Sequence, residues 1–227
     1  MTIYYQDEHV TLYHGDCLEL TEWTNADVLV TDPPYGISWE QPAYKTVGKS
    51  EGKRTKLHLG IQNDGDLTAR DAVLEAWAPR PALVFGAIDQ PFPARTKRVL
   101  VWKKPNDAGL FGQSIWRKDW EPIFIVGKWP QVPATESSVI GTLAGSHRQY
   151  AQGVHPHAKP IDVMERLIEK CPPGVIADPF AGSGSTLLAA RNLGRKAIGV
   201  ELEEKYCEII ANRLSQGAFD FEEATHG

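Results

Sequence analysis

The sequence contains no apolar run approaching the roughly 20 residues that a membrane-spanning helix requires. Cysteine is also scarce: Cys17, Cys171 and Cys207 lie far apart and show none of the paired spacings of a zinc site. A small, odd number of cysteines favours a reduced protein. The N-terminal segment MTIYYQDEHV lacks the basic-then-apolar pattern of a signal peptide. We therefore expect a cytoplasmic protein.

An excess of basic residues is missing too. The chain has 24 Lys and Arg against 29 Asp and Glu, which gives a net charge of −5. Any contact with nucleic acid must therefore come from local basic patches. No repeat and no linker divides the chain, and 227 residues are enough to bury a full core. We expect one domain spanning residues 1–227.

Apolar runs of strand length alternate with helical patterns along most of the chain. This alternation predicts an α/β fold with a mainly parallel sheet and helices on both of its faces. Near-continuous apolar runs agree with strands that are buried on both faces. The predicted strands are Val10–Tyr13, Val28–Thr31, Ala82–Phe85, Val99–Trp102, Ile123–Val126, Val175–Ala177 and Ala197–Val200; the predicted helices are Leu67–Trp77, Ile161–Cys171, Thr186–Leu193 and Glu203–Leu214.

A glycine-rich turn lies in GVIADPFAGSGSTLLAARNLGRKAIGVE, residues 174–201, between a predicted strand and a predicted helix. Gly182 and Gly184 carry no Cβ, so the backbone can approach a ligand closely. Ser185 or Thr186 is expected to cap the helix that follows. Glu201 ends the next strand, where a carboxylate can accept hydrogen bonds from both hydroxyls of a ribose.

Three ligands compete for this turn. A triphosphate-binding loop needs a lysine directly before Ser or Thr, but Ser185 stands before Thr186. A dinucleotide fold prefers a third glycine, and position 187 is Leu. An adenosine without phosphate, as in S-adenosylmethionine, fits better. The alternative without a ligand is a turn that only packs a helix on a strand.

The segment VLVTDPPYGISW, residues 28–39, places a carboxylate and two prolines after a buried strand. Prolines cannot extend a sheet, because each lacks an N–H and has a fixed φ. They can hold Asp32 and the carbonyl of Pro33 in a stiff arrangement. The structural alternatives are a turn cap for Asp32 and core packing for Tyr35.

Together these segments resemble the β-class DNA amino-methyltransferases. Residues 178–186 are similar to the cofactor-binding motif of that family, and residues 32–35 are similar to its catalytic motif. The catalytic motif comes first, as in the permuted chain order of the β-class. The resemblance implies a Rossmann-like class I methyltransferase fold, with six parallel strands and one antiparallel strand at an edge of the sheet.

The resemblance also implies S-adenosyl-L-methionine as the cofactor and no metal. LYHGDCLEL (12–20) is similar to a segment that lies near the adenine of the cofactor in this family, and HPHAKPIDVMERLI (155–168) to one that flanks its methionine moiety. The implied cofactor-binding residues are Asp16, Cys17, Lys159, Pro160, Asp178, Pro179, Phe180, Ala181, Gly182, Ser183, Gly184, Ser185, Thr186 and Glu201.

The implied activity is methyl transfer to the exocyclic amine of a base extruded from DNA. Asp32 and the carbonyl of Pro33 would accept hydrogen bonds from the two N–H groups, with Pro34 keeping both acceptors rigid. Tyr35 would stack on the extruded base. An aspartate at position 32 favours adenine N6. Cytosine N4 remains open, as does methylation of RNA or of protein amides, for which Asn in place of Asp32 is commoner. Intact motifs argue against a binding module that has lost catalysis.

Two long segments without strand or helix pattern, residues 37–63 and 127–154, are candidates for DNA contact and target recognition. Basic residues in them can contact phosphates, although a solvated run of charges is the alternative. The family resemblance is also compatible with a homodimer and with a cognate restriction enzyme. The candidate DNA-binding residues are Lys45, Lys49, Lys53, Arg54, Lys56 and Arg148.

Overall fold

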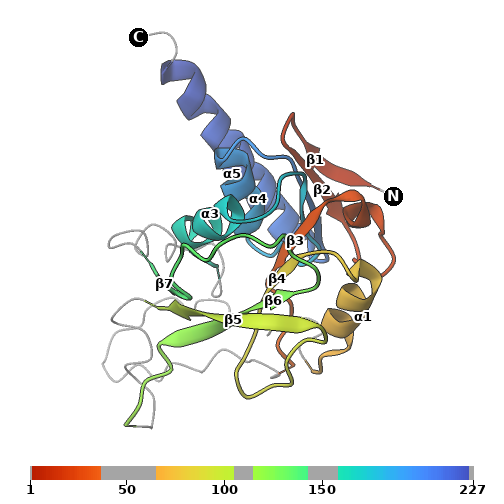
Figure 1. Ribbon diagram of the computed structural model, residues 1–227. Helices are drawn as coiled ribbons and strands as arrows, with labels where there is room; N and C mark the ends of the chain where they lie inside the picture. The colour runs from red at the N-terminus through yellow and green to blue at the C-terminus, as the bar shows by residue number, and fades with distance from the viewer. Residues whose placement is uncertain (1, 37–64, 105–114, 143–157, 225–227) are drawn as a thin grey trace, which may run out of the picture.

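The computed structural model describes residues 2–36, 65–104, 115–142 and 158–224, with side chains as far as residue 216 (Figure 1). Among these residues a nine-stranded sheet forms the centre, in the order β1-β2-β9-β8-β3-β4-β6-β5-β7. The strands are β1 (Ile3–Gln6), β2 (Val10–His14), β3 (Val28–Thr31), β4 (Ala82–Phe85), β5 (Thr96–Lys103), β6 (Trp120–Val126), β7 (Val139–Gly141), β8 (Ile176–Asp178) and β9 (Ala197–Glu201).

The sheet is mainly parallel, as predicted. Strands β2, β9, β8, β3 and β4 pair in parallel, and β7 pairs in parallel with β5. All seven predicted strands are present, but the antiparallel strand among them does not lie at an edge as predicted, and the sheet has nine strands rather than seven. Strand β6 pairs antiparallel with both β4 and β5 and therefore lies inside the sheet. Consequently the start of β6 lies beside the ends of its two neighbours, β4 and β5.

Two strands were not predicted, and both lie at edges. Strand β1 pairs antiparallel with β2, and its residues are exposed or half-buried, so it lacks the apolar run of a buried strand. Strand β7 has only three residues and lies inside the segment 127–154, for which no strand pattern was visible.

Helices cover both faces of the sheet (Figure 1). Helices α3 (Ile161–Glu169), α4 (Ser185–Asn192) and α5 (Glu204–Ala224) lie on one side, and α1 (Thr68–Trp77) lies on the other. Side chains along β3 alternate accordingly: Val28 and Val30 join the core with α3 and α4, whereas Leu29 joins the core with α1. The predicted α/β layering is confirmed.

Local sequence explains where the helices near the site begin. Helix α3 follows Pro160, and its apolar residues Val163, Met164, Leu167 and Ile168 recur at helical spacing and are all buried. Helix α4 begins after Gly184, whose φ of 79° is left-handed. The predicted capping by Ser185 or Thr186 is wrong, because Gly184 occupies the N-cap position and no side chain caps the helix.

None of the helices in the described part of the chain is sufficiently long and apolar to cross a membrane.

Candidate active site

Strand ends from distant parts of the sequence meet where the parallel strands of the sheet have their C-terminal ends. Strands β2, β3, β8 and β9 end there and β6 begins there, and together they surround a cavity of about 440 Å³. Tyr35 and Gly182, 147 positions apart in the sequence, both line it. The predicted site residues that line this cavity are Asp16, Cys17, Asp32, Pro33, Pro34, Tyr35, Lys159, Asp178, Pro179, Phe180, Ala181, Gly182, Ser183, Ser185, Thr186 and Glu201.

Two predicted site residues do not line the cavity. Gly184 forms the N-cap of α4, and the buried Pro160 forms the N-cap of α3, so both shape the backbone beside the cavity. The candidate DNA-binding residues lie outside the described residues: Lys45, Lys49, Lys53, Arg54 and Lys56 fall in 37–64, and Arg148 falls in 143–157.

Glu201 closes one side of the cavity at the end of β9. Its Oε2 accepts a hydrogen bond from the N–H of Gly182 (2.7 Å), and its Oε1 accepts one from the N–H of Glu203 (2.8 Å). Burial raises the pKa of Glu201 to about 7, although these two N–H groups favour the ionised form. Each carboxylate oxygen still has acceptor capacity for a ligand hydroxyl.

Asp178 lies at the end of β8, between the glycine-rich turn that follows it and β3. Its Oδ1 accepts hydrogen bonds from the hydroxyl of Thr31 (2.7 Å) and from the N–H of Phe180 (3.1 Å). Burial raises the pKa of Asp178 to about 6 against the opposing effect of hydrogen bonds from Thr186 and Thr31. Asp178 therefore ties the turn to the strand that carries Asp32.

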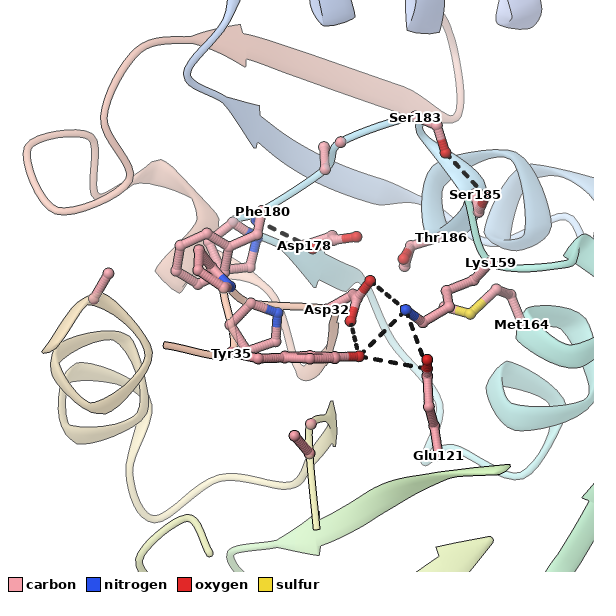
Figure 2. Close-up of a pocket in the computed structure, with 18 of the residues that line it drawn as sticks. Asp32, Tyr35, Glu121, Lys159, Met164, Asp178, Phe180, Ser183, Ser185 and Thr186 are labelled. Carbon is pink, nitrogen blue, oxygen red and sulfur yellow. Dashed lines mark hydrogen bonds and ion pairs between the residues drawn. The ribbon is translucent and has the colours of Figure 1, made fainter. Parts of the chain in front are cut away.

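Asp32 follows β3 and has a partner on each carboxylate oxygen (Figure 2). The hydroxyl of Tyr35 donates to Oδ1 (2.6 Å), and the ammonium of Lys159 donates to Oδ2 (2.6 Å). The Asp32 side chain keeps 26% of its surface exposed to the cavity, whereas that of Lys159 keeps 7%. The Asp32 carboxylate is thus held in place and remains partly exposed.

Two charged residues at this end of the cavity, Glu121 and Lys104, were not predicted. Glu121, at the start of β6, lies 3.4 Å from Lys159 Nζ through Oε2 and 2.5 Å from Lys104 Nζ through Oε1. Glu121 precedes Pro122 at the start of an apolar strand. A single carboxylate in such a strand was the one feature of the sequence that could have pointed to a functional role. Its significance depends on the antiparallel position of β6, which the sequence did not reveal.

Lys159 is charged despite its burial. Burial disfavours the ammonium, but Asp32 and Glu121 outweigh that effect and raise the pKa of Lys159 above its usual range. Burial likewise disfavours the Glu121 carboxylate, yet Lys159 and Lys104 lower its pKa. The predicted contact of Lys159 with the methionine moiety stays a prediction. The ammonium group itself forms an ion pair with Asp32.

A family model described as DNA methylase matches residues 26–212 of the chain, a range that includes both strand-end segments of the cavity. The chain belongs to the DNA methylase family. This methylase is an enzyme, and S-adenosyl-L-methionine is its cofactor.

Individual relatives support the assignment of the methylase. It is 46% identical over 220 residues to "Putative methylase YubD" of Escherichia coli, covering 88% of each chain. It is 28% identical over 273 residues to "Type II methyltransferase M.ScaI" of Streptomyces caespitosus, covering 95% of this chain and 84% of the relative. Its fold is similar to that of the M1.HpyAVI–SAM complex, with a TM-score of 0.59, 20% identity and coverage of 90% and 98%.

The residues of the methylase fit the cofactor. A Cβ built at Gly182 would meet only the carbonyl oxygen of Phe180, at 3.8 Å, so the space beside this backbone is open to a ligand. Glu201 presents carboxylate oxygens to the same cavity, whose volume lies within the usual range for small-molecule sites. Glu201 and the turn at 178–186 can therefore hold the adenosine part of S-adenosyl-L-methionine.

Proposed function

We propose that the methylase transfers a methyl group to the exocyclic N6 amine of adenine in a base extruded from DNA. The observation that carries the proposal is the meeting of Asp32 with the turn at Gly182 in one cavity. When bound, S-adenosyl-L-methionine supplies a methyl group on a sulfonium. The residues of the chain supply the acceptors, the orientation and the exclusion of water.

The amine is a poor nucleophile because its lone pair is delocalised into the ring. Asp32 and the carbonyl of Pro33 are proposed to accept hydrogen bonds from its two N–H groups, which turns the lone pair away from the ring. Pro33 and Pro34 keep the acceptors rigid, so their arrangement costs little at the moment of reaction. The ring of Tyr35, whose hydroxyl is already bound to Asp32, is proposed to stack on the base.

Glu201 is proposed to bind the ribose hydroxyls of the cofactor, with Asp16 and Cys17 near the adenine and Lys159 and Pro160 beside the methionine moiety. Asp16 and Cys17 follow β2, the strand next to β9, and line the same cavity. The remaining residues of the turn, from Asp178 to Thr186, are proposed to shape the backbone against the cofactor.

Cofactor affinity is expected to rise with pH through the ionisation of Glu201. With a pKa of about 7, its carboxyl group is mostly protonated at pH 6 and mostly ionised at pH 8, and only the ionised form accepts both hydroxyls. The Kd of the wild type should therefore fall by about tenfold more between pH 6 and 8 than that of Glu201→Gln. Isothermal titration calorimetry measures both. Equal pH dependence in the two proteins would remove Glu201 from the ribose site.

The choice of adenine N6 as the target amine rests on the aspartate at position 32, and cytosine N4 is the second candidate. DNA from cells that express the methylase should be digested to nucleosides and analysed by mass spectrometry. We expect N6-methyladenine in DNA. Finding only N4-methylcytosine would replace the proposed base, and transfer of labelled methyl groups to RNA or protein instead of duplex DNA would replace the proposed substrate class.

We also propose that the chain is one domain, with segments 37–63 and 127–154 contacting DNA and reading the target sequence. The basic residues at 45–56 and Arg148 would bind phosphates there. A cytoplasmic location, a homodimer and a cognate restriction enzyme complete the proposal. The name "Type II methyltransferase" of several relatives supports a role in restriction-modification.

A further inference from the structure

Four charged side chains meet at the end of the cavity that holds Asp32 (Figure 2 shows three of them). Lys159 Nζ lies 2.6 Å from Asp32 Oδ2 and 3.4 Å from Glu121 Oε2, and Lys104 Nζ lies 2.5 Å from Glu121 Oε1. The hydroxyl of Tyr35 bridges the two carboxylates, at 2.6 Å from Asp32 Oδ1 and 3.5 Å from Glu121 Oε2. Two carboxylates and two ammonium groups give a cluster of zero net charge.

A lysine at this position creates an electrostatic difficulty for the proposed chemistry. The amine nitrogen gains positive charge as its bond to the methyl carbon forms and the carbon–sulfur bond of the sulfonium breaks, which leaves a neutral thioether; the nitrogen then gives up a proton to Asp32. An ammonium bound to the same carboxylate opposes that positive charge and weakens the carboxylate as an acceptor. The effect is strong because Lys159 is almost completely buried and water screens it poorly.

Glu121 offsets this charge. Its Oε2 faces the Lys159 ammonium from the side opposite Asp32, so the ammonium lies between two carboxylates (Figure 2). Lys159 and, on the other oxygen, Lys104 together keep Glu121 ionised in spite of burial. The start of β6 brings Glu121 to this position because that strand runs opposite to its neighbours β4 and β5.

We propose that Glu121 is a positioning residue for methyl transfer: it holds Lys159 and offsets its charge, so that Asp32 can accept the N–H of the target amine. The inference rests on the proposed transfer to an exocyclic amine, and it holds for adenine N6 and cytosine N4 alike. Glu121 acts through Lys159 and Tyr35 rather than by contact with the cofactor.

A structural role alone would be to anchor the start of β6. Backbone pairing already holds that strand, with Glu121 opposite Trp102 on β5. Glu121→Gln keeps the size and shape of the side chain and removes its charge. It should therefore leave the sheet intact and disturb only the charge balance of the cluster.

The test compares four variants in single-turnover methylation of duplex DNA. Glu121→Gln leaves the cluster with one excess positive charge and is expected to slow transfer by about 10- to 100-fold. Glu121→Asp should be less impaired. The double variant Glu121→Gln/Lys104→Met restores zero net charge and is expected to recover at least about fivefold over Glu121→Gln. Lys104→Met alone provides the fourth corner of the cycle.

Binding measurements separate this role from unfolding. The cofactor Kd and the DNA KM of Glu121→Gln are expected to stay within about threefold of wild type. The control variant is Glu75→Gln, which removes an exposed carboxylate paired with Arg95 on the surface. It should match the wild type in every assay. Wild-type rates for Glu121→Gln, or a double variant as slow as the single one, would overturn the proposal.

A second readout does not need activity. Since Glu121 raises the pKa of Lys159, Glu121→Gln is expected to lower that pKa, measured by NMR of the lysine ε-methylene group. An unchanged pKa would overturn the role of Glu121, whatever the rates. A wild type that methylates no amine of DNA, RNA or protein, with a lowered pKa in the variant, would overturn the proposed function instead.

Discussion

Replacement of Asp32 by asparagine is expected to slow methyl transfer by about 10³- to 10⁴-fold while cofactor binding persists. The variant keeps the shape of the side chain but loses the negative charge that accepts the N–H of the amine and then its proton. Glu201 and the turn at Gly182 are unchanged, so the cofactor Kd should stay within a few-fold of wild type. Transfer of a labelled methyl group to duplex DNA and titration calorimetry measure the two effects.

The asparagine also leaves the buried Lys159 with one carboxylate partner in place of two. Thermal unfolding should therefore be recorded with the kinetics, and Glu75→Gln again provides an acidic control outside the cavity. A folded Asp32→Asn protein that retains more than a tenth of the wild-type rate would show that Asp32 is not the acceptor.

Substitution of Gly184 by alanine is expected to destabilise the protein by about 2–5 kcal/mol and to weaken cofactor binding by at least about tenfold. Its φ of 79° is strained for any other residue, and a Cβ would lie 2.9 Å from Ile210 Cγ1. Ile210 is fully buried and has little room to give way, so relief of that overlap is expected to shift the turn beside the cavity. Chemical denaturation and calorimetry report the two losses.

Gly194→Ala is the matched control for this prediction. Gly194 has a similar φ of 66°, but nothing lies within 4 Å of a Cβ built there. The control isolates backbone strain and should cost about 1 kcal/mol without a change in cofactor affinity. Equal losses in the two variants would mean that the contact with Ile210 plays no part.

The buried strands of the fold were predictable because each is a short apolar run between polar turns. Val28–Thr31 and Ala82–Phe85 were predicted with the bounds that the structure shows. Strand β1 was not predictable in this way, since Ile3–Gln6 pairs on one side only and its residues are exposed or half-buried. The position of β6 inside the sheet depends on which strands pair, and no local pattern specifies that.

Some residues of the candidate site could likewise be predicted from local sequence, and others could not. Asp32 and Gly182 stand in contiguous segments whose residue types are unusual for a strand end, so both could be found from the sequence. Glu121 could not, because its partners Lys104 and Lys159 lie 17 and 38 positions away. Only the antiparallel course of β6 gives that carboxylate a place beside Asp32. The chemistry was thus visible in short segments, whereas the charge balance around it required the tertiary structure.

The lateral pairing of β3 with β8 is what joins the acid-bearing half of the site to the glycine-bearing half. The two halves meet through strand pairing, and the position of the site residues does not depend on which half comes first along the chain. A circularly permuted chain that starts near residue 158, with a linker joining the old termini, would bring the same side chains to the same edge. A gene rearrangement that changes the order of the two halves would therefore preserve the site and its chemistry.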